Sequence, residues 1–112
     1  MDRQSVSGKA SAEPVDGVHL KLLAAGERMS IQHFRIDPGA TVPEHSHPHE
    51  QLGYVTSGTL TFEVEGGKIK ISAGDSYSLA GDEPHAAVNE GDTIVEGIDI
   101  FSPPRTDPDW AD

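Results

Sequence analysis

The chain has 112 residues, the size of a single domain, and it contains no cysteine, which excludes disulfide bonds and thiolate metal sites. Nineteen acidic and eight basic residues give a formal net charge of −11, which repels nucleic acid and anionic membrane surfaces. The first ten residues lack the apolar segment of a secretory signal, and no apolar run is long enough to span a membrane, so we expect a cytoplasmic protein.

Short segments of alternating apolar and polar residues follow one another along the chain. Residues 1–16 are polar and predict a flexible arm or a first edge strand, and residues 17–112 predict one domain. Glycine and proline interrupt the segments at regular intervals, and this rhythm predicts an all-β sandwich or barrel of two packed antiparallel sheets. Ser57-Gly58 has the composition of a hairpin turn. We expect strands at residues 18–23, 29–36, 52–56, 59–64, 68–73, 76–79, 85–89 and 93–101.

Histidines gather between the second and third of these segments. His45 and His47 alternate, so an extended chain would direct both imidazoles to the same side, and Gln51 shares their parity. His85 begins a later segment and can approach from across a barrel. Imidazole is a good ligand for Zn, Fe, Ni and Cu. The pattern therefore predicts a site for one divalent transition metal, whose identity among Ni, Fe, Mn and Zn the sequence does not select.

Two neighbouring residues leave the ligand set open. His49 has the parity of a ligand, but Pro48 is expected to bend the chain and turn this imidazole elsewhere. Glu50 has the opposite parity, yet a β-bulge would bring its carboxylate to the metal in place of the Gln51 amide. The choice matters because three imidazoles and an amide leave the charge of a divalent ion uncompensated, which favours an anionic substrate and Lewis-acid chemistry. Two histidines and a carboxylate are typical of iron oxygenases instead.

In these residues the chain resembles the cupins, which are small double-stranded β-helix (jelly-roll) barrels with two sequence motifs. The first motif is matched at the family spacing by Gly39, His45, His47, Gln51 and Gly58, with Gln51 where the family has Glu. The second is matched by Gly74, His85 and Asn89, while Ala80 and Asp82 stand where the family has Pro and Gly. The resemblance implies a cupin fold and a metal held by His45, His47, Gln51 and His85.

A narrower resemblance, to the pectin-degradation cupins, covers residues 45–55 and 99–105. It implies an enzyme that opens the ring of 4,5-unsaturated uronates released by polysaccharide lyases, with an Asp near the chain end as the acid/base. That Asp is Asp99 here. The same resemblance implies substrate binding by Phe101 and Arg105, to which we add Tyr54 as a third candidate, although Tyr54 and Tyr77 also suit barrel filling. The partner would be a small anionic, sugar-like substrate.

Asp99 is also unusual without reference to a family. It lies between Ile98 and Ile100, which share one face of the predicted last strand, so Asp99 falls on the other face. If that face lines the barrel, desolvation raises the carboxyl pKa, as a proton-transfer group requires. The alternative is a solvent-facing Asp that limits pairing at a sheet edge. Arg105 has two interpretations as well: a fork for a substrate carboxylate, or an ion pair with Asp107 or Asp109.

Three other functions are compatible with such a chain: a metal-dependent dioxygenase, a lyase acting on another small molecule, and a sugar-binding protein without activity. The isoleucine face of the predicted last strand needs a cover that one small sheet does not supply. We therefore expect a homodimer, the commonest closed oligomer.

Overall fold

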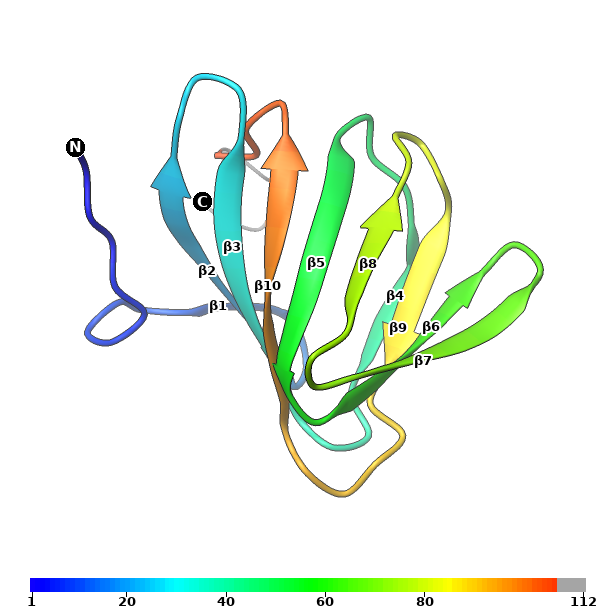
Figure 1. The fold of residues 1–112 in the computed structure, drawn as a ribbon. Coiled ribbons are helices and arrows are strands. Elements are labelled where there is room, and N and C mark those ends of the chain that lie inside the picture. The colour runs from blue at the N-terminus through cyan, green and yellow to red at the C-terminus, as the bar shows by residue number, and fades with distance from the viewer. Residues whose placement is uncertain (107–112) are drawn as a thin grey trace.

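Residues 1–106 are described by the computed structural model, and within them every regular element is a β-strand. The ten strands are β1 (Ala12–Val15), β2 (Val18–Ala25), β3 (Ser30–Ile36), β4 (Thr41–His45), β5 (Glu50–Ser57), β6 (Thr59–Val64), β7 (Gly67–Ser72), β8 (Ser76–Leu79), β9 (His85–Val88) and β10 (Val95–Ser102). They form a large sheet in the order β1-β2-β3-β10-β5-β8 and a small sheet in the order β4-β9-β6-β7. All the pairings described are antiparallel, and the sheets face each other as the two walls of a barrel (Figure 1). The expected all-β class and two-sheet architecture are confirmed.

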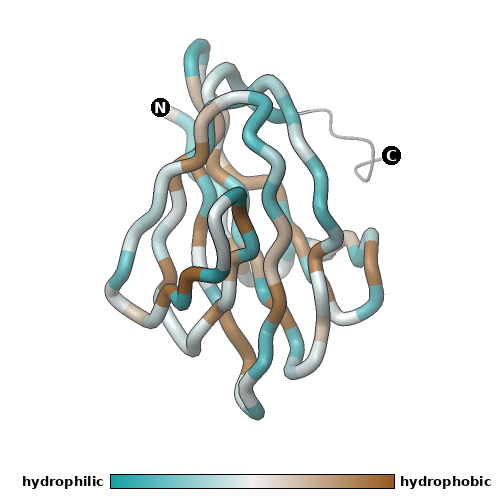
Figure 2. The backbone as a smooth tube through the Cα atoms, turned by 90° about the vertical axis from the view of Figure 1, so that its right-hand side faces the viewer, coloured by the Kyte–Doolittle hydropathy of each residue, from teal (hydrophilic) through white to brown (hydrophobic). Residues whose placement is uncertain are grey.

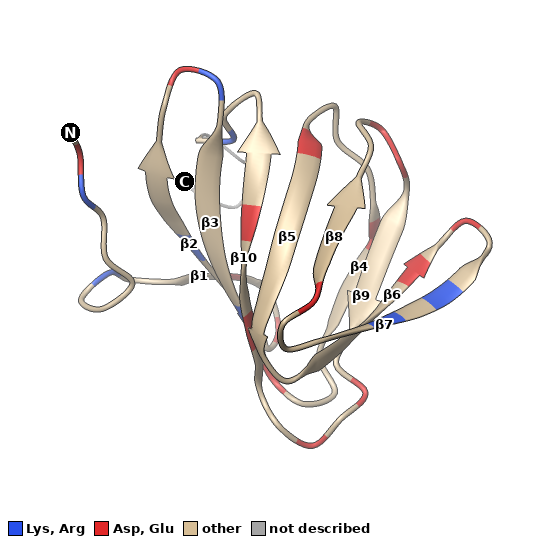
Figure 3. Ribbon diagram, viewed as in Figure 1, with Lys and Arg blue, Asp and Glu red and all other residues tan. Residues whose placement is uncertain are grey.

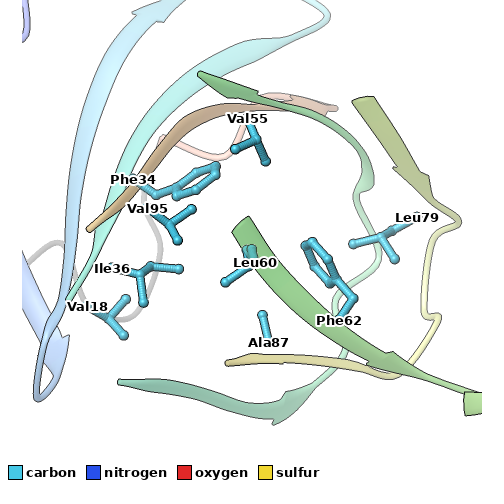
Figure 4. Packing of buried hydrophobic residues seen from close by; sticks show 9 residues of the cluster. All are labelled: Val18, Phe34, Ile36, Val55, Leu60, Phe62, Leu79, Ala87 and Val95. Carbon is cyan, nitrogen blue, oxygen red and sulfur yellow. The ribbon is translucent and has the colours of Figure 1, made fainter. Parts of the chain in front are cut away.

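The alternation of side chains places the core between the sheets. Along β10 the residues are alternately buried and half-buried from Val95 to Ser102, and along β5 buried and exposed residues alternate from Gln51 to Val55. Figure 2 shows the resulting mixture of hydrophobic and hydrophilic positions along each strand. The buried apolar side chains of both sheets meet in one cluster (Figure 4), which comprises Val18, Phe34, Ile36, Val55, Leu60, Phe62, Leu79, Ala87 and Val95. This burial is the main stabilising contribution to the barrel.

The expected hairpin at Ser57-Gly58 is wrong. β5 belongs to the large sheet and β6 to the small one, so the chain changes sheets at this corner. Gly58 has φ of 83°, and a Cβ there would lie 2.7 Å from the Ile94 carbonyl oxygen. Only glycine fits both the left-handed backbone and the close approach. The true hairpin joins β6 to β7, which pair from Thr59–Ser72 to Val64–Gly67.

The structure adds strand β4, which the sequence rhythm did not predict. β4 pairs with β9 and forms the edge of the small sheet, while β1 pairs with β2 at the edge of the large sheet. Acidic residues are spread over the loops at both ends of the barrel (Figure 3). No helix long and apolar enough to cross a membrane occurs in residues 1–106.

Candidate metal centre

Three imidazoles converge where the two sheets meet, at the upper end of the barrel in Figure 1. His45 ends β4 and His85 begins β9, and the two are register partners in the small sheet. His47 lies in the loop that leads to β5. Their potential ligand atoms all lie within 4.8 Å of one another. The ring centroids of His45 and His85 are 4.3 Å apart, and those of His47 and His85 are 5.2 Å apart.

Backbone carbonyls fix the tautomer of each ring. The Nδ1–H of His45 donates to Pro43 O at 2.9 Å, that of His47 to His49 O at 3.0 Å, and that of His85 to Glu83 O at 2.8 Å. A carbonyl oxygen only accepts, so Nδ1 carries a proton in each ring, and in neutral His45 and His85 the lone pair is on Nε2; His47 Nε2 also faces an oxygen, Gln51 Oε1. Hydrogen bonds of this kind orient metal-binding histidines in known sites. The three Nε2 atoms are therefore prepared to bind a cation.

Burial keeps two of these rings in the neutral form that binds metals. Desolvation lowers the pKa of His47 and of His85 below the usual value, and the neighbouring histidines lower both pKa values further. A neutral imidazole retains its free Nε2 lone pair at neutral pH. The donor chemistry of the group therefore fits a divalent transition metal.

Gln51 completes the donor set from the large sheet. Its side chain is buried, and its Oε1 lies 2.9 Å from His47 Nε2. Two ligands bound at right angles, each about 2.1 Å from one ion, are about 3 Å apart, so this separation suits a shared cation. Glu50, in contrast, is exposed. The structure thus brings the Gln51 amide, and not the Glu50 carboxylate, to the three histidines.

The route by which these residues meet differs from the expected one. β4 ends at His45, so His47 and Gln51 are not on the same strand as His45, and parity along one strand does not bring them together. The β4–β5 loop carries the chain from the small sheet to the large one. His85 likewise approaches from the strand next to His45, not from across the barrel. His49 lies outside the group, and its ring contacts the edge of the Phe101 ring at a centroid distance of 6.1 Å.

Asp99 lies on β10 with its carboxylate buried inside the barrel. The Tyr77 O–H donates to its Oδ1, and Gln32 Nε2 is 3.5 Å from its Oδ2. Burial raises the pKa of Asp99 to about 6, although hydrogen bonds from Tyr77, Gln51 and Gln32 favour the charged form. The expected placement on an inward face is therefore observed, and Gln51 links this carboxylate to the histidine group.

Arg105 and Phe101 line the same cavity as this carboxylate, and the positive charge of Arg105 lowers the pKa of Asp99. The Arg105 guanidinium carbon lies 5.2 Å from the centroid of the Phe101 ring, a cation–π distance. The Arg105 backbone N–H donates to Ser30 Oγ at 2.8 Å, which anchors the segment after β10 to the start of β3. The alternative partners expected for Arg105, Asp107 and Asp109, lie outside the described residues.

A cavity of about 390 Å³ joins these side chains. Its polar wall includes Gln32, His45, Gln51, Tyr77, His85, Asp99 and Arg105, and its apolar wall includes Leu20, Phe34, Val42, Leu60, Phe62 and Phe101. The size lies at the lower end of the usual range for small-molecule sites, roughly 300–1,000 Å³. A potential metal site, a buried carboxylate and a guanidinium therefore share one small cavity.

Tyr54 is the predicted site residue that the structure places elsewhere. It is 44% exposed on the outer face of the large sheet, and it does not line the cavity. It therefore neither fills the barrel nor faces the cavity. The same face carries Leu52, 49% exposed, and the cross-strand partners of these two residues, Ile98 and Ile100. We call these four residues the outer apolar face.

Sequence reasoning missed the two residues that hold Asp99, namely Tyr77 and Gln32. Both contacts depend on which strands are neighbours, and the sequence pattern does not give strand order. One signal was present in Gly53, because a glycine inside a strand often marks a close approach of another group.

The family model for the cupin domain matches residues 32–101, and the chain therefore belongs to the cupin family. Within it, the chain is similar to the pectin degradation protein KdgF of Dickeya dadantii (strain 3937), with 32% identity over 95 residues that cover 82% of this chain and 84% of the relative. The solved structure of KdgF from Halomonas sp. matches with a TM-score of 0.86 at 29% identity, over 96% of this chain and 97% of that one. Both resemblances drawn from the sequence are confirmed.

Two further matches are more distant. The H2HPP isomerase of Bacillus subtilis is 33% identical over 67 residues, and these cover 60% of this chain but 28% of that protein. The polyketide cyclase RemF from Streptomyces resistomycificus matches with a TM-score of 0.82 at 17% identity, over 91% of this chain and 79% of that one, so it shares the fold alone.

Proposed function

We propose that this cupin is a metal-dependent enzyme that opens the ring of 4,5-unsaturated uronate monosaccharides, a step in the breakdown of pectin- or alginate-type polysaccharides. The observation that carries the proposal is the buried Asp99 carboxylate, which shares one cavity with Arg105, Gln51 and two of the clustered histidines. The similarity to two proteins named KdgF, one a pectin degradation protein, supports the choice of substrate.

The reaction is an isomerisation, in which every atom of the substrate is kept. The anomeric hydroxyl loses its proton, the bond between the anomeric carbon and the ring oxygen breaks, and an aldehyde and an enolate result. The enolate then gains a proton on the double-bond carbon that does not carry the oxygen, and becomes a ketone. A group that accepts one proton and returns one is sufficient, so no oxidant or reductant is needed.

Asp99 suits this proton transfer. A general acid/base acts best when its pKa lies near the working pH, and burial raises the pKa of Asp99 to about 6. Arg105 is suited to bind the substrate carboxylate, because a guanidinium pairs with a carboxylate through two parallel hydrogen bonds. A divalent cation on the imidazole and Gln51 ligands would supply a Lewis acid that polarises substrate oxygens. Phe101 offers an apolar ring beside both charged groups.

Ultraviolet absorbance tests the proposal, because ring opening removes the double bond conjugated with the carboxylate. Untagged protein is loaded separately with Ni, Fe, Mn or Zn and incubated with unsaturated monouronates, and the rate is compared with spontaneous opening. We expect acceleration by at least one loaded form, a large but measurable fall of the rate in Asp99→Asn, and loss of the acceleration after chelation. Wild-type protein that leaves the sugars at the spontaneous rate with every metal would refute the substrate assignment.

An anaerobic repeat separates this proposal from oxygenation. The isomerisation proceeds at the same rate without dioxygen, whereas a dioxygenase stops. The name of the Bacillus subtilis relative, an isomerase, is consistent with the first outcome.

A further inference from the structure

Tyr77, Gly53 and Asp99 form a row across three neighbouring strands of the large sheet. Gly53 on β5 is the register partner of Asp99 on β10 and also of Tyr77 on β8. Tyr77 is thus two strands away from Asp99, about 10 Å at the usual strand spacing. Its side chain nevertheless spans β5, and its hydroxyl donates a hydrogen bond to Asp99 Oδ1.

Gly53 is what permits this crossing. A Cβ at this position would overlap the ring and hydroxyl of Tyr77. Backbone conformation does not explain the glycine, because Gly53 is not among the glycines with positive φ. A glycine inside a strand weakens it, so its presence indicates a need for space. The space is occupied by the Tyr77 ring.

The ring is also held from the opposite sheet. Phe62 on β6 packs against it with centroids 4.6 Å apart and an interplanar angle of 52°. The Tyr77 ring therefore lies between the Gly53 backbone on one side and the Phe62 ring on the other. A rigidly held hydroxyl directs the carboxylate that it contacts, because a short, charge-assisted hydrogen bond has a narrow geometry.

The two oxygens of Asp99 consequently have different surroundings. Oδ1 accepts the Tyr77 hydroxyl, whereas Oδ2 has a contact of 3.5 Å with Gln32 Nε2, at the limit of a hydrogen bond. The Tyr77 hydroxyl is the donor in this pair. Gln51 also hydrogen-bonds to this carboxylate, so three side chains hold Asp99 where it lines the cavity.

We propose that Tyr77 is a positioning residue, which reaches across Gly53 and fixes the orientation of the Asp99 carboxylate for its proton transfer. The inference rests on the proposed function for the role of Asp99, and it adds Tyr77 and Gly53 to the groups on which the rate depends. Tyr77 acts through Asp99 and needs no contact of its own with the substrate.

Steady-state kinetics of metal-loaded full-length variants on unsaturated monouronates provide the first test. In Tyr77→Phe we expect kcat to fall at least tenfold with KM within twofold of wild type, because only the orientation of the acid/base is lost. Tyr54→Phe, the matched change on the outer apolar face, should leave both constants unchanged. A wild-type kcat in Tyr77→Phe would overturn the inference.

A double-mutant cycle separates positioning from general stabilisation. If Tyr77 acts through Asp99, adding Tyr77→Phe to Asp99→Asn lowers kcat no further than Asp99→Asn alone. A further tenfold loss would show an independent role and would contradict the proposal. Gly53→Ala, which displaces the ring, should reproduce the kinetic loss of Tyr77→Phe and add nothing to it.

A spectroscopic test remains decisive if the sugars are not the substrate. A buried hydroxyl held by a carboxylate exchanges slowly, so the wild-type protein should give a Tyr77 hydroxyl proton signal by NMR at neutral pH. The signal should vanish in Tyr77→Phe and in Gly53→Ala while the amide spectrum stays that of a folded protein. Retention of the signal in Gly53→Ala would refute the role of the glycine gap, whereas an inactive wild type with this pattern would refute the substrate assignment alone.

Discussion

Replacing Asp99 with Asn should stabilise the metal-free protein at neutral pH. The Asp99 carboxyl has a pKa of about 6 in the folded chain, against an ordinary value of 3.8. Below pH 4 the group is neutral in both folded and unfolded chains, so it contributes no difference. Between pH 4 and pH 6 the unfolded chain gives up this proton first, so folding becomes less favourable as the pH rises. Above pH 6 the full penalty applies.

The size of the effect follows from the shift. Two pKa units correspond to about 3 kcal/mol. The amide that replaces the carboxylate in Asp99→Asn would avoid this penalty and keep an oxygen that accepts the Tyr77 hydroxyl. Its N–H also has an acceptor at hand, since Gln32 Oε1 is buried without a hydrogen-bond partner among the described residues. We therefore expect the free energy of unfolding of Asp99→Asn to be about 2–3 kcal/mol higher than that of wild type at pH 7. At pH 4 the removal of the carboxylate should give no such increase.

Urea unfolding at pH 4, 5, 6 and 7 measures the difference. A chelator is included because a nearby cation would lower the pKa of Asp99 and reduce the effect. Asp92→Asn, an exposed acid in the β9–β10 loop, is the matched control for the loss of one negative charge and should show little change with pH. A difference between Asp99→Asn and wild type that is constant from pH 4 to pH 7 would refute the reasoning.

Three further predictions concern the metal, the surface and the core. His85→Ala should lower metal affinity at least about a hundredfold by calorimetry, since even outer partners of ligands contribute tenfold to a hundredfold; His33→Ala, whose ring pairs with Glu96 outside the cavity, should bind normally. We propose that the outer apolar face joins two copies of the chain, so Leu52→Glu should convert a dimer to a monomer in sedimentation at micromolar concentration, and a monomeric wild type would exclude this interface. Leu60→Ala, at a site 2% exposed, should reduce the unfolding free energy by about 2–5 kcal/mol, and a loss below about 1 kcal/mol would indicate a loosely packed barrel.

Strands such as β3, β5 and β10 were predictable because buried positions alternate with more exposed ones along them. β4 escaped prediction because it is an edge strand whose residues are half-buried or exposed, and Pro43 interrupts its pattern. The corner at Gly58 was misread for a related reason. Alternation says that two neighbouring segments are strands, but it does not say whether they pair or lie in opposite sheets.

The three histidines that lie together in the structure were predicted to do so, but through incorrect geometry. Motif spacing selected His45, His47 and His85, which lie at the end of β4, in the β4–β5 loop and at the start of β9, and not on one continuous strand. The surroundings of Asp99 show more clearly which contacts cannot be predicted from the sequence pattern. Its contact with Tyr77 exists because β5 separates β8 from β10, a fact of topology that periodicity in a single chain does not contain. Tyr54 was misassigned because its outward direction follows from the register of β5.

The origin of the ligands has a mechanical consequence. His45 and His85 belong to the small sheet and Gln51 to the large one, so any ion bound by all of them would tie the two walls together. Binding of the ion then raises the free energy of unfolding, by about 2.7 kcal/mol when the free ion is at a hundred times its dissociation constant. An ion bound there would thus cross-link the two sheets, and the metal-free protein would be the less stable form.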